Sequence, residues 1–221
     1  MPNWCVQNCL LRGPRKDVAQ FYSILTSLLH KPEVRENGFG KFWLGNVCEA
    51  FGYDFDKLAA AGARLRGNVD PSPETSASLC HPEADLVPFR PCILDEDTAE
   101  VRFSVTTAWG PSDWFNGMIA ERYPACYYAW QATDEFGNFH TCHNPELIDL
   151  KPYEIEQWNE DYVSFSKGEE REAAAHLEKV TGVPFTFEDI LRGEDHIASM
   201  LADWNSSHPD EEIYFHYWEE E

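Results

Sequence analysis

The chain has 221 residues, of which 43% are hydrophobic and 14% aromatic, and its formal net charge is −22. This composition excludes an intrinsically disordered chain and allows one or two folded domains. The charge is uneven: residues 1–110 carry 11 basic and 14 acidic residues, whereas residues 111–221 carry 6 basic and 25 acidic residues. Because a field of this sign repels phosphate backbones, direct nucleic-acid binding is not expected.

The sequence also indicates a compartment. Met1–Leu11 lacks the basic start and the long apolar run of a secretion signal. No window approaches the roughly 20 apolar residues that a membrane-spanning helix requires. The cysteines are odd in number, seven, and scattered along the chain, which favours reduced thiols over a disulfide framework. We therefore expect a cytoplasmic protein with no membrane contact and no cofactor, while its oligomeric state stays open.

The first element is an apolar-rich strand over Trp4–Leu11, which ends at Arg12-Gly13. Pro14 is predicted to open a helix, because its missing N–H is harmless in the first turn. The helix should run to about Leu29, since apolar residues recur at helical spacing and form one stripe. The members of this stripe are Val18, Phe21, Tyr22, Leu25, Leu28 and Leu29.

A similar unit follows near residue 100. Val101, Phe103 and Val105 alternate with polar residues, as in a half-buried strand. Pro111 is predicted to open a second helix, which ends near Tyr123-Pro124. A strand over 126–132 and a turn over 134–138 should follow, with 139–142 pairing back on that strand.

Two interleaved strand–helix units predict an α+β fold of the ferredoxin-like, split βαβ type, with an antiparallel sheet and helices on one face. We place this core at 1–144, with a long insertion over about 31–99. The insertion is predicted to hold short helices over 42–51 and 56–61, a strand over 63–69 and an exposed loop over 70–91.

Residues 145–221 are predicted to form an acidic, helix-rich extension or a second small α/β unit. The segment 153–165 reads as strand or extended chain. Ser166 and Glu169 match a capping box that opens a helix, and Thr186 with Asp189 suggests another cap. A further helix should break at Arg192-Gly193, and a final strand is expected over 213–218.

Two motifs resemble a known family. The opening Met1-Pro2-Asn3-Trp4-Cys5 is followed by Asn8 and Gly13-Pro14, and the second motif is Thr107-Ala108-Trp109-Gly110-Pro111 with Trp114 and Tyr123-Pro124. Together they resemble the YubB-type ferredoxin-like family of plasmid- and phage-associated bacterial proteins of unknown function, over about residues 1–140. The resemblance implies a fold and a link to mobile genetic elements, and it brings no known active site.

Aromatic side chains suggest one candidate binding site. Trp4, Trp109, Trp114 and Trp130 could form a binding surface on the open face of the sheet. Ferredoxin-like proteins that bind RNA stack bases on such aromatics. The basic, glycine-rich strand typical of that module is absent here, and core packing is the alternative interpretation.

The segment His140-Thr141-Cys142-His143 is the best local metal candidate, because it places three possible ligands within four residues. Cys126 or His81 could complete the site. In an alternating strand, His140 and Cys142 share a face while His143 points away. The alternative is a polar edge strand.

Three functional hypotheses follow, and the sequence does not establish whether the protein is an enzyme. The first is a non-enzymatic interaction or binding module, linked to a mobile genetic element and binding a basic protein partner. The second is a small metal- or thiol-dependent enzyme that uses Cys126, His140, Cys142 and His143. The third is nucleic-acid mimicry by the acidic C-terminal half.

Overall fold

The computed structural model of the chain describes residues 3–30, 40–70, 91–137, 140–157 and 162–220. Its contacts divide into two compact units, Met1–Ile148 and Asp149–Glu221, which we call the N-terminal and the C-terminal unit. The division falls after residue 148, whereas the sequence predicted it after residue 144. Most of the loop predicted over 70–91, including His81, lies outside the described residues. None of the helices in the described ranges has the length and apolarity required to cross a bilayer.

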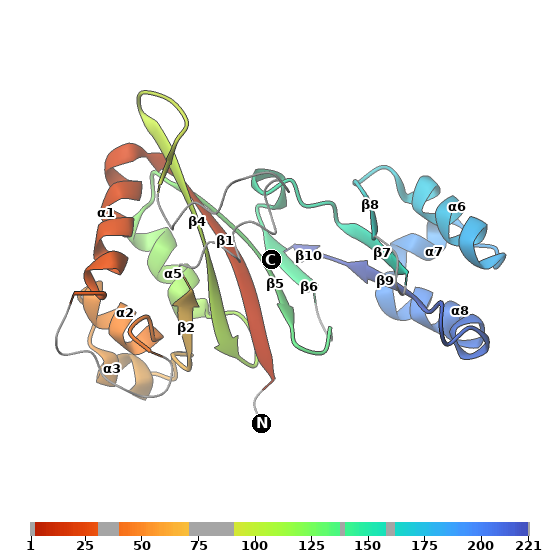
Figure 1. Cartoon of the computed structure of the whole chain (residues 1–221), viewed down its shortest axis with the longest axis horizontal. Helices are drawn as coiled ribbons and strands as arrows, with labels where there is room; N and C mark the ends of the chain where they lie inside the picture. Colours follow the sequence, from red (N-terminus) through yellow and green to blue (C-terminus); the bar gives the residue numbers. More distant parts are fainter. Residues whose placement is uncertain (1–2, 31–39, 71–90, 138–139, 158–161, 221) are drawn as a thin grey trace. The chain divides into compact units, whose positions relative to one another are not determined.

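The N-terminal unit is built on an antiparallel sheet (Figure 1). Its strands follow the order β6-β5-β1-β4-β2, and the short β3 also pairs with β4. The central strands β1 and β4 pair along their whole length, from Trp4 opposite Ala108 to Pro14 opposite Thr98. The strands are β1 (Trp4–Pro14), β2 (Gly67–Asp70), β3 (Cys92–Ile93), β4 (Thr98–Ala108), β5 (Tyr127–Asp134) and β6 (His140–His143).

Helices α1 (Arg15–Ser27), α2 (Leu44–Ala50), α3 (Phe55–Ala60) and α5 (Asp113–Arg122) lie to one side of this sheet (Figure 1). The two prolines predicted to open helices are not the first helical residues. Pro14 still pairs with Thr98 as the last residue of β1, so α1 begins one residue later. In α5 the cap is Ser112, whose hydroxyl accepts the Phe115 N–H at 3.3 Å. A hydroxyl satisfies an otherwise unpaired amide of the first turn, which proline cannot do.

The core of the N-terminal unit lies between this sheet and its helices. Phe21 of α1 is fully buried and contacts Phe51, Phe103 and Tyr123, with ring centroids 5.7, 5.1 and 5.8 Å away. The stripe predicted for the first helix is buried at Val18, Phe21 and Leu25. Burying such side chains contributes roughly 1.5–3 kcal/mol each before entropy is counted.

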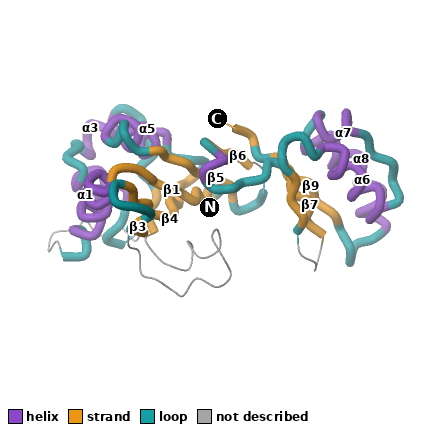
Figure 2. Tube along the Cα trace, turned by 90° about the horizontal axis from the view of Figure 1, so that it is seen from above, coloured by secondary structure: helices purple, strands orange, loops and turns teal. Residues whose placement is uncertain are grey.

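The C-terminal unit has its own sheet, with the order β8-β7-β9 and antiparallel pairing throughout. Its helices lie on one side of β7 and β9 (Figure 2). A separate core forms there, which includes Leu177, Ile197 and Phe215. The elements are β7 (Tyr153–Gln157), β8 (Val163–Phe165), α6 (Glu170–Thr181), α7 (Phe187–Leu191), α8 (Glu194–Ser207) and β9 (Ile213–Tyr217), and they are preceded by the 3-10 turn η1 (Pro145–Leu147) and followed by β10 (Glu219–Glu220).

The sequence predicted two helix caps and one helix break in the C-terminal unit, and the structure confirms one cap and the break. Thr186 and Asp189 form the predicted capping box. The break at Gly193 is confirmed, because this residue has a φ of 86° between α7 and α8. The cap at Ser166 is wrong: α6 starts after Glu169, and no side chain caps it. The Glu169 carboxylate does accept the Ser166 N–H at 2.8 Å, so one of the two hydrogen bonds of a capping box forms, but before the helix begins.

Candidate functional site

A pocket of about 500 Å³ opens at one end of the N-terminal sheet. Four separate segments meet there: the residue before α2, the start of α3, the approach to β2 and the end of β4. Such a volume is within the range of small-molecule sites. The lining consists of Trp43, Phe55, Ala63, Arg64, Leu65, Arg66, Ala108 and Trp109.

Trp109 is the most unusual residue of the pocket. Its side chain is 63% exposed, and its φ is 74°, a conformation that costs a non-glycine residue of order 1–3 kcal/mol. The backbone is held there because the Trp109 N–H donates to the Asn3 carbonyl at 2.8 Å. The Thr107 hydroxyl donates to the Gly110 carbonyl at 2.5 Å, which fixes the next peptide. The fold therefore maintains a strained backbone that presents a large apolar ring to solvent.

Trp43 and Phe55 supply a second, fixed aromatic surface. Their ring centroids lie 4.9 Å apart with the planes inclined at 58°. The Trp43 indole N–H donates to the Leu65 carbonyl at 3.0 Å. A Cβ at Gly45 would approach the Trp43 ring to 2.5 Å, so the indole occupies space that only glycine leaves open. These contacts orient the ring before any ligand arrives.

Among the residues that the structure describes around this pocket, Arg64 and Arg66 are the charged ones, and both are exposed. Within the part of the chain that the structure describes, neither guanidinium forms an ion pair. The Arg64 guanidinium reaches the Trp109 carbonyl at 3.5 Å. Gly67 follows directly, and a Cβ there would overlap the Thr106 carbonyl oxygen, so a glycine keeps β2 close to β4 and places both arginines at the pocket. The pocket is thus locally cationic in a chain of net charge −22.

A second hollow, of about 580 Å³, lies near the start of α1. Its lining mixes charges, with Arg15 and Lys16 beside Glu96 and Asp97. Arg12, which also lines it, is engaged by Glu100 at 2.7 Å. This hollow has no preference for one sign of charge, and it is the weaker candidate.

The structure does not gather the four predicted tryptophans on one face. Trp130 is buried with the helix-covered core and lies 6.2 Å from the His143 ring. Trp114 packs against that core beside Tyr53, with centroids 5.8 Å apart. Trp4 is half-buried in β1 opposite Ala108. Only Trp109 belongs to the pocket.

The predicted metal ligands are spread over different surroundings. His140 and Cys142 are opposite Thr133 and Gln131 of β5, while His143 is opposite Trp130 on the other face. Cys126 lies before β5, against the backbone of Gly13. Burial first, and the charge of Asp17 second, raise the pKa of the Cys126 thiol to about 11. Among the described residues of the N-terminal unit, no three His, Cys, Asp or Glu side chains meet around one point.

A largely buried polar network lies beneath α5. The Gln7 side-chain amide donates to Asn116 at 2.6 Å and to the Tyr128 hydroxyl at 3.1 Å. The Tyr128 hydroxyl in turn donates to Asn116 at 2.9 Å and lies 3.3 Å from the Cys9 sulfur. Burial raises the pKa of Cys9 to about 12, so this thiol stays protonated and is a poor nucleophile. We therefore interpret the network as part of the interior packing rather than as a reactive site.

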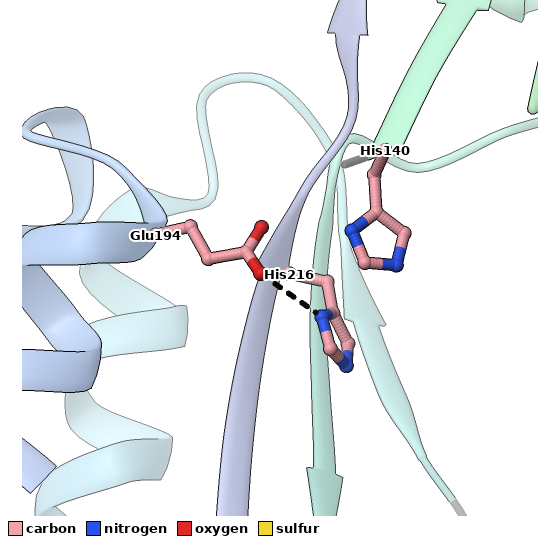
Figure 3. Close-up of side chains that lie close together, drawn as sticks. All are labelled: His140, Glu194 and His216. Carbon is pink, nitrogen blue, oxygen red and sulfur yellow. Dashed lines mark hydrogen bonds and ion pairs between the residues drawn. The ribbon is translucent and has the colours of Figure 1, made fainter. Parts of the chain in front are cut away.

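The C-terminal unit contains a titratable cluster around His216 of β9, and Figure 3 shows this ring beside Glu194. His216 Nδ1 lies 3.4 Å from Glu194 of α8, and Nε2 lies 3.5 Å from Glu156 of β7. Burial of the ring opposes its charge, but the hydrogen bond and charge of Glu194, aided by Glu156, outweigh it and raise the pKa of His216. The Glu194 carboxylate also accepts the Tyr217 N–H at 3.2 Å. His140, which the figure also labels, belongs to β6 of the N-terminal unit.

A scan against protein-family models finds no match for this chain, and searches of the curated proteins and of the solved structures find none either. Sequence reasoning included Trp109 but missed Trp43, Phe55, Arg64 and Arg66. One signal was present: Arg64 and Arg66 alternate with Leu65 just before a strand, so both guanidinium groups should fall on one face.

Proposed function

We propose that the protein is a non-enzymatic binding module and that the pocket lined by Trp43, Phe55, Arg64, Arg66 and Trp109 is its ligand site. The observation that carries this proposal is the exposed Trp109, held at a positive φ by backbone hydrogen bonds beside two guanidinium groups. Strained backbone persists where the surrounding structure enforces it, and such positions cluster at ligand sites.

The chemistry of the lining favours binding over catalysis. Its side chains are aromatic, aliphatic or guanidinium, and in the described lining no carboxylate, imidazole, thiol or hydroxyl is available as a base or nucleophile. Arginine stays protonated and serves as a hydrogen-bond donor. The thiol-dependent alternative gains no support at Cys126, because burial raises the pKa of this thiol.

We also infer that the N-terminal unit is ferredoxin-like. The order β5-β1-β4-β2, with antiparallel neighbours and with α1 and α5 in the two crossovers, supports this inference. The motifs around Trp4 and Trp109 support membership of the YubB-type family and a link to mobile genetic elements. Since no family model matches, this membership rests on those motifs.

The acidic C-terminal unit is the region to which the basic-partner and nucleic-acid-mimic hypotheses refer. It carries 5 basic and 20 acidic residues, a net charge of −15. High negative charge is also what a well-solvated surface has, so the proposal rests on the pocket rather than on this charge.

A thermal-shift screen of the full chain against a chemically diverse library of small molecules tests the proposal. We expect at least one compound to raise the melting temperature of the wild type and to lose this effect in Trp109→Ala, because binding to the folded state stabilises it. Phe136→Ala is the matched control, since that ring is 73% exposed in the same unit and lies outside the pocket. Compounds that stabilise the wild type and Trp109→Ala equally, or a screen with no hit, would remove the pocket as the binding site.

A further inference from the structure

We infer, on the basis of the proposed function, that the ligand of this pocket is a planar aromatic anion of about the size of a mononucleotide. Its ring would stack on Trp109, and its phosphate or carboxylate would be bound by Arg64 and Arg66.

The charge of the ligand follows from the lining. Aromatic pockets often bind cations, because the faces of the rings are electron-rich. Here Arg64 and Arg66 are the charged residues of the lining. Among the lining residues that the structure describes, no acidic side chain offsets their charge. A cation would be repelled at this site, whereas a carboxylate or phosphate accepts paired hydrogen bonds from the planar guanidinium groups.

The shape of the ligand follows from the aromatic residues. Trp109 presents an exposed indole on a backbone that hydrogen bonds hold in place, and the Trp43 ring is held by its hydrogen bond to Leu65. Stacking on aromatic side chains is favourable for any flat π-system. A volume of about 500 Å³ accommodates one ring system with an attached anionic group.

The rest of the molecule argues for a free small molecule rather than a nucleic-acid strand. A strand would bring phosphate charges beyond the reach of the two arginines, to a protein with a net charge of −22. One anionic group needs only Arg64 and Arg66. The same local chemistry therefore favours a mononucleotide or an aromatic carboxylate over a polymer.

Calorimetric titration of the full chain at low salt tests this inference with probes that carry the aromatic ring, the anionic group or both. The probes are adenosine 5′-monophosphate, adenosine, ribose 5-phosphate and indole-3-acetate, of which the last is a flat carboxylate. We expect adenosine 5′-monophosphate, indole-3-acetate or both to bind. Adenosine and ribose 5-phosphate should each bind roughly tenfold more weakly than the nucleotide, because each lacks either the charge or the ring.

Variants then assign each part of the ligand to its residues. Arg64→Gln with Arg66→Gln should weaken binding of the anion by roughly tenfold and leave adenosine unchanged. The control pair Arg15→Gln with Lys16→Gln removes the same charge from the lining of the second hollow in the same unit and should have little effect. Trp109→Ala should weaken every ring-containing probe, and Trp109→Phe, which keeps a ring in the same place, should restore part of the affinity.

The outcomes distinguish this inference from the function on which it rests. A hit from the thermal-shift screen that depends on Trp109 but is cationic or lacks a flat ring would overturn the inference and leave the binding site intact. Failure of both adenosine 5′-monophosphate and indole-3-acetate to bind would also overturn it. So would tighter, Trp109-dependent binding of a single-stranded oligonucleotide, because the ligand would then be a polymer.

Discussion

In the N-terminal unit, Gln7, Tyr128 and Cys9 share hydrogen bonds in the buried interior, whereas in the C-terminal unit His216 pairs with carboxylates nearer the solvent. Among the described residues, the buried polar side chains lie in the N-terminal unit with one exception, Glu170. Burial of a polar group is stabilising only when its partners are in place. Both units have an apolar core, but the network of Gln7, Tyr128 and Cys9 in the N-terminal unit is neutral, whereas the pairs around His216 in the C-terminal unit respond to pH.

The largest expected effect is in the aromatic core of the N-terminal unit. Phe21→Ala should lower the free energy of unfolding by about 3–5 kcal/mol, because it removes a fully buried ring and leaves a cavity. Urea unfolding followed by tryptophan fluorescence measures this loss. Phe136→Ala, at an exposed position, should change the value by less than about 0.5 kcal/mol. Equal effects of the two substitutions would contradict the assigned core.

The polar network should give the next largest effect. Tyr128→Phe removes a hydroxyl that contacts Gln7, Cys9 and Asn116, and it should lower the free energy of unfolding by about 1–3 kcal/mol. Its neighbour provides a close control, because Tyr127 is 66% exposed and Tyr127→Phe should be nearly neutral. If Tyr128→Phe is as stable as the wild type in the same urea titration, the network contributes nothing to stability.

The smallest effect depends on pH and belongs to the C-terminal unit. Because the pKa of His216 is raised in the folded state, its stabilising contribution is complete below the ordinary histidine pKa and is lost as the pH rises through the folded value. The melting-temperature difference between wild type and His216→Gln should therefore be larger at about pH 5.5 than at about pH 8.5.

A carboxylate variant identifies the origin of that pH dependence. Glu194→Gln removes the nearer charge and should abolish most of the difference between the two pH values, since Glu194 is the stronger of the two causes that raise the pKa. If the melting-temperature difference between wild type and His216→Gln instead grows as the pH rises, the pKa of His216 is not raised in the folded state.

The C-terminal unit should also lose stability at acidic pH, for a separate reason. Hydrogen bonds from Thr186 and His196 lower the pKa of Asp189 to about 2, and the Gly168 N–H chiefly lowers the pKa of Glu170. Carboxylates of this kind stabilise the fold above their ordinary pKa, and this contribution is lost as the pH falls through the folded value. The C-terminal unit should therefore be most stable between these acidic transitions and the titration of His216.

The sequence by itself determined the local elements. The apolar stripe around Phe21 requires a helix that packs on one side, the alternation around Phe103 predicts a strand, and Thr186 with Asp189 specifies a helix start. The strand is less exposed than the alternation predicts, because Ser104 on its polar face is also buried. These features depend on residues a few positions apart, so periodicity and capping rules suffice to identify them. The same rules failed at Ser166, where the chain turns before the helix begins.

Only the tertiary structure decided which distant residues meet. Trp43, Phe55, Arg64 and Trp109 come from four segments, and the pairing of β2 with β4 and the entry into α2 bring them to one pocket. It also separated residues that the sequence had grouped, because Trp130 is part of the core and Trp114 packs against it, while Trp109 stayed exposed. Strand register and helix packing set these positions through many weak contacts across the whole chain, and no local pattern encodes them.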